Sequence, residues 1–146
     1  MPHSVIDEIS TQDTFRALNE QQSTALVDVR TVAEWAYVGL PDISATGRPL
    51  WMVEWVRLGA QSPDPAFVDR LLAEAGGTLP ERLFFICRSG IRSMAAARAV
   101  ATAMDQAEKP VHCTNVAKGF EGDLDQHRHR GSINGWKVDG LPWAQN

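Results

Sequence analysis

The chain contains 146 residues with a formal net charge of −4; 44% of the residues are hydrophobic and 22% are charged. These values are typical of one globular domain over residues 1–146, and they exclude a generally basic nucleic-acid-binding protein. No apolar segment is long enough to span a bilayer, and the first residues lack the basic and apolar regions of a signal peptide, so neither a membrane nor a nucleic acid is expected as a partner.

The predicted elements of the N-terminal half alternate between strand and helix. A short strand is expected at 4–6, followed by a helix that Ser10 caps. The apolar run "ALVDV" at 25–29 has the composition of a strand buried on both faces. A helical turn is expected over 31–38, and a loop rich in breakers then leads to a strand at 50–55.

The C-terminal half repeats this alternation. A helix over 65–74 begins with proline, which is favoured at the first helical position. A strand at 82–87, a helix at 93–107 and a strand at 110–116 follow, and the remaining chain is mostly irregular. The whole pattern predicts an α/β domain with a mainly parallel sheet of about five strands and helices on both faces.

The stretch "FFICRSGIRS" places Cys87 at the carboxyl end of a predicted strand, which is the edge where ligands bind in such sheets. With only one other cysteine, Cys113, a disulfide framework is not expected, and a reducing cytoplasmic location is favoured. The loop that follows Cys87 consists of Arg88, Ser89, Gly90, Ile91 and Arg92.

This loop has the composition of an anion site around a thiolate. Its backbone N–H groups and the first turn of the next helix can converge on one point, and Gly90 permits a tight curl. Two guanidinium groups and the helix dipole favour negative charge there, which makes Cys87 a candidate nucleophile. Ser93 is expected to cap the helix. The alternative is a buried, inert cysteine.

Three motifs carry a resemblance to the rhodanese (sulfurtransferase) family. "CRSGIRS" (87–93) resembles the active-site loop of that family, and "LVDVRTVAEW" (26–35) resembles its Asp-x-Arg and Glu-aromatic signature. "NVAKGFEGD" (115–123) and "NGWKVDGLPW" (134–143) are similar to the family's last loop and its C-terminal tail. Together they span most of the chain in the expected order and imply a single rhodanese-like three-layer domain.

The resemblance implies a persulfide mechanism. Cys87 would take the outer sulfur of a sulfane donor such as thiosulfate and pass it to a thiol, cyanide or protein acceptor, in covalent catalysis without cofactor or metal. Ser89, Gly90 and Ile91, with the flanking arginines, would bind the substrate: the loop amides cradle the persulfide while Arg88 and Arg92 attract the anionic donor. Arg92 has a rival role, which is to brace the loop from behind.

Two other functions remain open. Cysteine phosphatases and arsenate reductases of the same fold close their loop with Cys-x5-Arg, whereas Cys87 and Arg92 are separated by four residues, and the shorter loop is better suited to sulfur. A binding or redox-sensing module with little turnover is the third possibility. Such degenerate modules often lose the cysteine that this chain keeps.

Several residues depart from the family pattern or have competing interpretations. The segment 38–48 lacks the family's histidine, so access to the site is expected to differ there. Lys118 replaces a glycine and either borders the donor site or is solvated. Cys113 is either a resolving thiol or, as we favour, a packed strand residue. The run "HRHR" (127–130) lacks further ligands at metal-binding spacing and is expected to be a solvated loop.

The Asp-x-Arg motif is expected to be structural. Asp28 and Arg30 are predicted to form a buried carboxylate–guanidinium pair that ties the second strand to neighbouring loops. Glu34 lies four residues after Arg30, so these two side chains could also pair on one helical turn.

Overall fold

The computed structural model describes residues 5–145. Its main sheet has five strands, all parallel, in the order β1-β6-β5-β2-β4. These strands are β1 (Asp7–Ile9), β2 (Thr24–Asp28), β4 (Leu50–Met52), β5 (Arg82–Ile86) and β6 (His112–Val116). The helices are α1 (Thr11–Glu20), α2 (Val32–Tyr37), η1 (Ser44–Thr46), α3 (Phe67–Glu74) and α4 (Ile91–Gln106). The fold class predicted from the sequence is therefore confirmed.

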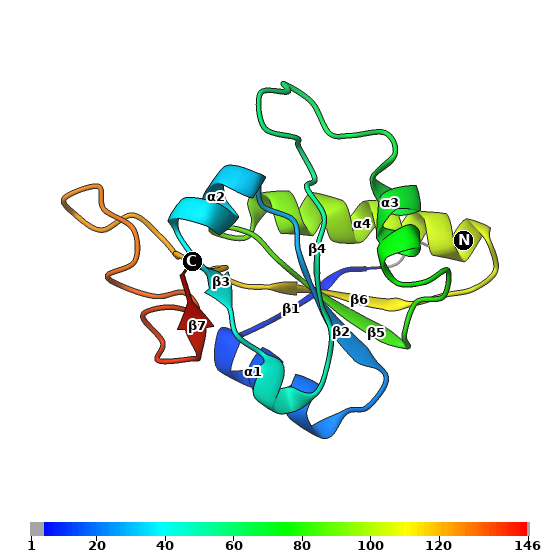
Figure 1. Ribbon diagram of the computed structural model, residues 1–146, viewed down its shortest axis with the longest axis horizontal. Helices are drawn as coiled ribbons and strands as arrows, with labels where there is room; N and C mark the ends of the chain where they lie inside the picture. The colour runs from blue at the N-terminus through cyan, green and yellow to red at the C-terminus, as the bar shows by residue number, and fades with distance from the viewer. Residues whose placement is uncertain (1–4, 146) are drawn as a thin grey trace.

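Helices cover both faces of the sheet, with α1 on one side and α3 and α4 on the other (Figure 1). Alternate residues of a strand point to opposite faces, which explains the apolar runs 25–27 in β2 and 83–86 in β5. In β5, Leu83 and Phe85 pack towards α3 and α4, whereas Phe84 and Ile86 pack towards α1 and the C-terminal segment. All four side chains are fully buried, so β5 is fixed firmly in the centre of the molecule.

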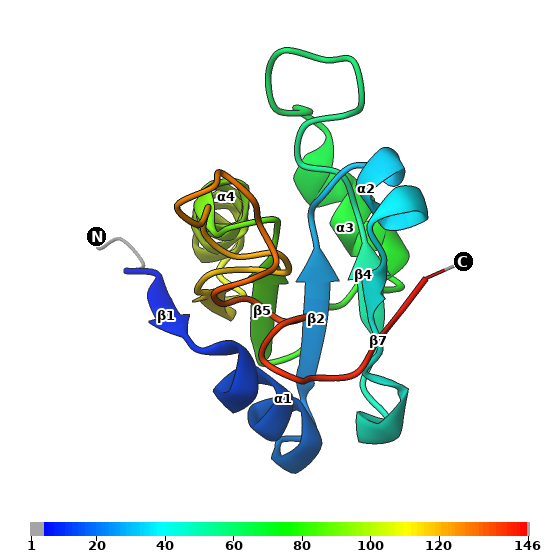
Figure 2. The same cartoon turned by 90° about the vertical axis from the view of Figure 1, so that its left-hand side faces the viewer.

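The edge strands of the sheet have different bounds from those predicted. β1 and β4 are the edge strands (Figure 2). β1 lies at 7–9 rather than at 4–6, and part of that predicted strand falls outside the described residues. β4 ends at Met52, before the predicted end at residue 55. The predicted cap of α1 is confirmed, because the Ser10 side chain accepts a hydrogen bond from the Asp13 N–H.

A second, two-stranded sheet joins distant parts of the chain. β3 (Leu40–Pro41) pairs antiparallel with β7 (Trp143–Ala144), and the Asp42 N–H donates to the Pro142 carbonyl. The tail that was expected to be mostly irregular thus includes a paired strand. This pairing also fixes part of the segment 38–48, whose conformation the sequence left open. Within residues 5–145, none of the helices combines the length and apolarity needed to cross a membrane.

Candidate active site at Cys87

Cys87 follows β5 directly and lies at the carboxyl edge of the sheet, where α4 begins four residues later. The residue is 1% exposed and belongs to the core cluster that packs against α4. Gly90 is the N-cap of α4 with φ 115°, a left-handed conformation that other residues adopt only with strain. The strand and the helix therefore fix the thiol in place, and Gly90 allows the chain to turn between them.

Three hydrogen-bond donors converge on the Cys87 sulfur. The Gly90 N–H lies 3.1 Å from Sγ, the Ser93 N–H 3.3 Å and the Ser93 hydroxyl 3.1 Å. Two of the donors are backbone groups at the start of α4, where the helix dipole also favours negative charge. An anionic sulfur at this position would have three donors from which to accept hydrogen bonds.

Ser93 has a different role from the one that the sequence suggested. It was expected to cap α4, but the helix begins at Ile91 and Ser93 lies in its first turn, fully buried. Its hydroxyl bonds Cys87 Sγ and also lies 2.6 Å from Asn115 Oδ1. The helix begins earlier than predicted because Gly90 takes the capping position with its positive φ. The six-residue spacing between Cys87 and Ser93 was the sequence signal for this contact.

Arg92 is held by Glu34 rather than pointing freely into the site. Its two terminal nitrogens lie 2.7 and 2.9 Å from the two Glu34 oxygens, a bidentate pair between α4 and α2. Burial alone would raise the pKa of the Glu34 carboxyl, but hydrogen bonds from Arg92 and Thr31 outweigh it and lower the pKa to about 2. The hydrogen bond to Glu34 raises the pKa of Arg92. The sequence allowed two roles for Arg92, attracting an anionic donor or bracing the loop, and this geometry favours bracing.

The segment after β6 clamps the cysteine loop through the backbone. The Phe120 N–H donates to the Cys87 carbonyl at 2.8 Å, and the Glu121 and Gly122 N–H groups donate to the Arg88 carbonyl at 3.0 and 3.1 Å. Gly119 has φ 61°, and a Cβ there would collide with the backbone of Cys87 and Arg88. Only glycine allows these two segments to approach so closely.

The remaining predicted loop residues lie at the protein surface beside the buried Cys87, and we call this surface the rim of the site. Arg88 is exposed and Ile91 is 81% exposed, while Ser89 is half-buried. Lys118 approaches Gly90 through its backbone, and its ammonium group pairs with Asp123 at 3.1 Å, with both side chains about half exposed. The charge available to meet an anion at this rim is therefore centred on Arg88.

The Asp-x-Arg motif forms the buried pair that was predicted. Arg30 Nε and Nη2 lie 2.9 and 2.7 Å from the Asp28 oxygens, and both side chains are fully buried. Nη2 also donates to the Gly39 carbonyl, and the guanidinium lies over the Phe120 ring. The suggested Arg30–Glu34 pair is not formed, because Arg30 folds back onto Asp28 while Glu34 turns to Arg92.

Cys113 is a packed strand residue, as favoured from the sequence. It is 3% exposed, and burial raises the pKa of its thiol to about 12. Its register partner is Leu83, four residues before Cys87. At about 3.3 Å per residue the two cysteines are separated by about 13 Å along the sheet. Cys113 is therefore not placed to resolve a bond at Cys87.

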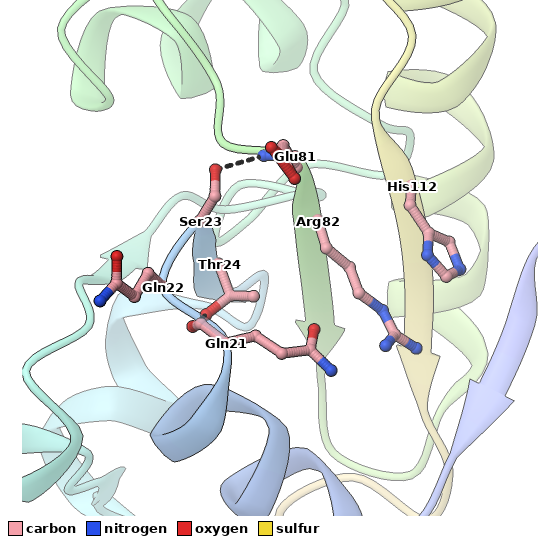
Figure 3. Close-up of a pocket in the computed structure, with 7 residues that line it drawn as sticks. All are labelled: Gln21, Gln22, Ser23, Thr24, Glu81, Arg82 and His112. Carbon is pink, nitrogen blue, oxygen red and sulfur yellow. Dashed lines mark hydrogen bonds between the residues drawn. The ribbon is translucent and has the colours of Figure 1, made fainter.

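A pocket of about 470 Å³ lies at the opposite, amino-terminal end of the strands (Figure 3). Thr24, Arg82 and His112 line it, and each is the first residue of its strand. The Glu81 N–H donates to the Ser23 hydroxyl across its rim. Because Cys87 follows the last residue of β5, this pocket lies at the other end of that strand and takes no part in the cysteine site.

Comparison with known proteins identifies the fold. No protein-family model matches the chain. The solution structure of the polysulfide-sulfur transferase homodimer from Wolinella succinogenes superposes with a TM-score of 0.59 at 17% identity, over 97% of this chain and 80% of that one. The parallel sheet with a cysteine loop at its carboxyl edge is a rhodanese-like α/β fold.

A closer relationship holds with a mycobacterial protein. The crystal structure of Rv0390 from M. tuberculosis matches with 38% identity and a TM-score of 0.80, over 98% of this chain and all of that one. The chain belongs to the same family as Rv0390. It is also 28% identical to the uncharacterized protein RP600 of Rickettsia prowazekii, over 95% of this chain and 98% of that protein.

Proposed function

We propose that the protein is a sulfurtransferase that carries sulfane sulfur on Cys87. The observation that carries this proposal is the convergence of three donors on Sγ at the start of α4. These donors stabilise the thiolate that attacks the donor and the thiolate that leaves when the sulfur is passed on.

The reaction has two displacement steps. The Cys87 thiolate attacks the outer sulfur of thiosulfate, a new S–S bond forms, and sulfite leaves with the electron pair of the broken bond. An acceptor thiolate or cyanide then attacks the outer sulfur of the persulfide. The Cys87–sulfur bond breaks, its electron pair returns to Sγ, and the thiolate is regenerated. Arg88 at the exposed rim attracts the anionic donor.

The Arg92–Glu34 pair favours sulfur over phosphate as the transferred group. A phosphate-binding loop uses a bidentate guanidinium to hold the oxyanion. Here both terminal nitrogens of Arg92 already bind Glu34. The structure of RPA3614 from Rhodopseudomonas palustris, described as a possible tyrosine phosphatase, shares the fold with a TM-score of 0.53 at 18% identity, over 99% of each chain. Phosphatase activity is therefore the alternative that the experiment must separate.

The experiment measures intact mass after incubation with thiosulfate and, separately, with polysulfide. We expect Cys87 to gain one sulfur atom, which cyanide removes as thiocyanate. Cys87→Ser should gain none, whereas the matched variant Cys113→Ala should gain it normally, because Cys113 is buried elsewhere in the sheet.

Two results would overturn the proposal. A folded wild-type protein that gains no sulfur from either donor would support a binding or redox-sensing module instead. Hydrolysis of an aryl phosphate or reduction of arsenate that depends on Cys87, without persulfide formation, would favour the phosphatase or reductase function.

A further inference from the structure

Asn115 of β6 connects the cysteine loop to the edge of the sheet, although it is not part of the loop. Its side-chain nitrogen donates to the Gly90 carbonyl at 3.1 Å and to Glu8 Oε2 at 2.9 Å. Its oxygen lies 2.6 Å from the Ser93 hydroxyl, which in turn lies 3.1 Å from Cys87 Sγ. Asn115 and Ser93 are both fully buried, so water does not replace the bonds that join Asn115, Ser93 and Cys87, whereas Glu8 is exposed.

The orientation of the Asn115 amide is determined by its partners. A backbone carbonyl and a carboxylate only accept hydrogen bonds, so the amide nitrogen must face Gly90 and Glu8. The amide oxygen must then face Ser93. Because Glu8 and the Gly90 carbonyl fix the amide in this orientation, the atom that faces the Ser93 hydroxyl is Asn115 Oδ1, which can only accept a hydrogen bond.

The Ser93 hydroxyl has one proton and two neighbours that can accept it. When Cys87 is neutral, the proton points to Asn115 Oδ1, the shorter contact, and a lone pair of Oγ faces the sulfur. When Sγ carries negative charge, the proton turns to the sulfur because hydrogen bonds to anions are stronger. Asn115 Oδ1 then loses its donor in a buried position, which is unfavourable.

We propose that Asn115 is a positioning residue that competes with Cys87 for the Ser93 proton and so limits how strongly the loop stabilises the thiolate. The proposal rests on the sulfur-transfer function, in which Sγ gains and loses charge in each cycle. In the persulfide the charge is on the outer sulfur, and the Ser93 proton returns to Asn115. When the outer sulfur is transferred, the electron pair of the S–S bond stays on Sγ, and the hydroxyl turns back to it. No proton leaves Ser93.

This competition has a chemical consequence. A thiolate that is stabilised too strongly is a weaker nucleophile, because nucleophilicity decreases as basicity decreases. Asn115 therefore keeps Cys87 reactive toward the sulfur donor, while Ser93 still stabilises the departing thiolate. A side chain without an acceptor at position 115 would not compete for the Ser93 proton and would leave the thiolate more strongly stabilised.

The test is the pH profile of Cys87 alkylation by iodoacetamide, followed by peptide mass in the full chain. Wild type, Asn115→Leu, Ser93→Ala and the double variant form a cycle. Replacing Asn115 by leucine removes the competing acceptor at similar volume. We expect the pH midpoint of alkylation to fall by about half to one pH unit in Asn115→Leu and to rise by a similar amount in Ser93→Ala.

The decisive comparison is between the two backgrounds. The two backgrounds are the chain with Ser93 and the chain with Ser93→Ala. Asn115→Leu also removes the hydrogen bond to the Gly90 carbonyl, but this bond is lost in both backgrounds. If the proposal is correct, Asn115→Leu lowers the midpoint by more when Ser93 is present than when it is alanine. Equal shifts in the two backgrounds would overturn it. If the leucine variants fail to fold, by circular dichroism, Asn115→Ala replaces them in the same cycle.

The experiment separates this inference from the proposed function, because alkylation needs no sulfur donor. Coupled shifts in a protein that forms no persulfide would support the hydrogen-bond competition and reject the sulfurtransferase. Persulfide formation with uncoupled shifts would reject the role of Asn115 alone. Glu8→Gln is the matched control: it keeps an acceptor for the Asn115 nitrogen, so the difference between backgrounds should persist.

Discussion

The Glu34→Gln substitution tests whether the pair between α2 and α4 braces the cysteine loop. Glutamine keeps the size of the side chain and one acceptor oxygen but removes the charge that holds Arg92 at 2.7 and 2.9 Å. The pKa of Glu34 is lowered from 4.5 to about 2 in the folded protein. Full linkage would make this lowering worth about 3 kcal/mol of stability, since each pKa unit corresponds to about 1.4 kcal/mol.

The expected loss is smaller because water reaches the pair. The side chains of Arg92 and Glu34 are 26% and 19% exposed, which screens their interaction. We therefore expect Glu34→Gln to lower the free energy of unfolding by about 2 kcal/mol at pH 7. The exposed Asp13–Arg16 pair offers a matched control. Asp13→Asn should cost less than about 0.5 kcal/mol.

The assay is urea unfolding followed by circular dichroism at several pH values. Because the folded pKa of Glu34 is depressed, its stabilisation is present above about pH 4.5 and is lost as the pH falls towards 2. The difference between wild type and Glu34→Gln should therefore be largest at pH 7 and shrink below pH 4.5. Other carboxylates titrate in both proteins and cancel in this difference. A difference that is absent at pH 7, or that does not change between pH 7 and pH 3, would refute the reasoning.

Three further predictions concern the loop, its clamp and the second cysteine. Gly119→Ala should lower the free energy of unfolding by at least about 2 kcal/mol in thermal unfolding, because the added Cβ meets the Cys87 backbone. Gly131→Ala is the control: with φ 82° and open space around it, the substitution should cost about 1 kcal/mol. Equal costs would contradict the clamp. Arg88→Gln should raise the KM for thiosulfate about tenfold in the thiocyanate assay with kcat little changed, and an unchanged KM would place donor recognition elsewhere. In Cys87→Ser, Cys113 should resist maleimide at pH 8 until urea unfolds the protein, because its pKa of about 12 keeps it as the unreactive thiol, and rapid labelling of the native protein would contradict that raised pKa.

The central strands and the position of Cys87 could be predicted because they depend on local composition. The run 25–27 in β2 and the run 83–86 in β5 are wholly apolar, which is typical of strands covered on both faces. An abrupt change to arginine, serine and glycine marks the end of β5. The pairing of β3 with β7 could not be predicted, since each strand has two residues and a hundred residues separate them.

The partners of charged side chains were harder to predict than the elements that carry them. The spacing of Arg30 and Glu34 fits a helical pair, but Arg30 lies before α2 begins and folds back onto Asp28. Glu34 instead meets Arg92, which is 58 residues away in sequence. The fold brings these two residues together at the start of α4. Sequence spacing describes neighbours on one helix and says nothing of this contact.

The contact between Ser93 and Cys87 shows the same limit of sequence-based prediction. Serine near a helix start is ordinarily a cap, and residue type alone gives no reason to expect otherwise. Its actual role follows from the path of the backbone: Gly90 takes the capping position, so Ser93 moves into the first turn, where its hydroxyl reaches both Cys87 and Asn115. The signal was the spacing from the cysteine, which has meaning only once the start of α4 is known.

Three kinds of group form the site: the donors around Cys87 Sγ, the Arg92–Glu34 pair and the exposed Arg88. Backbone N–H groups and a hydroxyl surround Sγ, where the proposed sulfur transfer would need a thiolate to be stabilised in each cycle. Arg92 serves the rigidity of the loop through Glu34. Under the proposed function, attraction of an anionic donor would fall to Arg88, which is exposed. Since the chain as a whole has a net charge of −4, its long-range field does not draw in anions, and a donor such as thiosulfate would depend on local positive charge. The effect of Arg88 on the KM for thiosulfate should therefore weaken as salt is added, because exposed charges are screened.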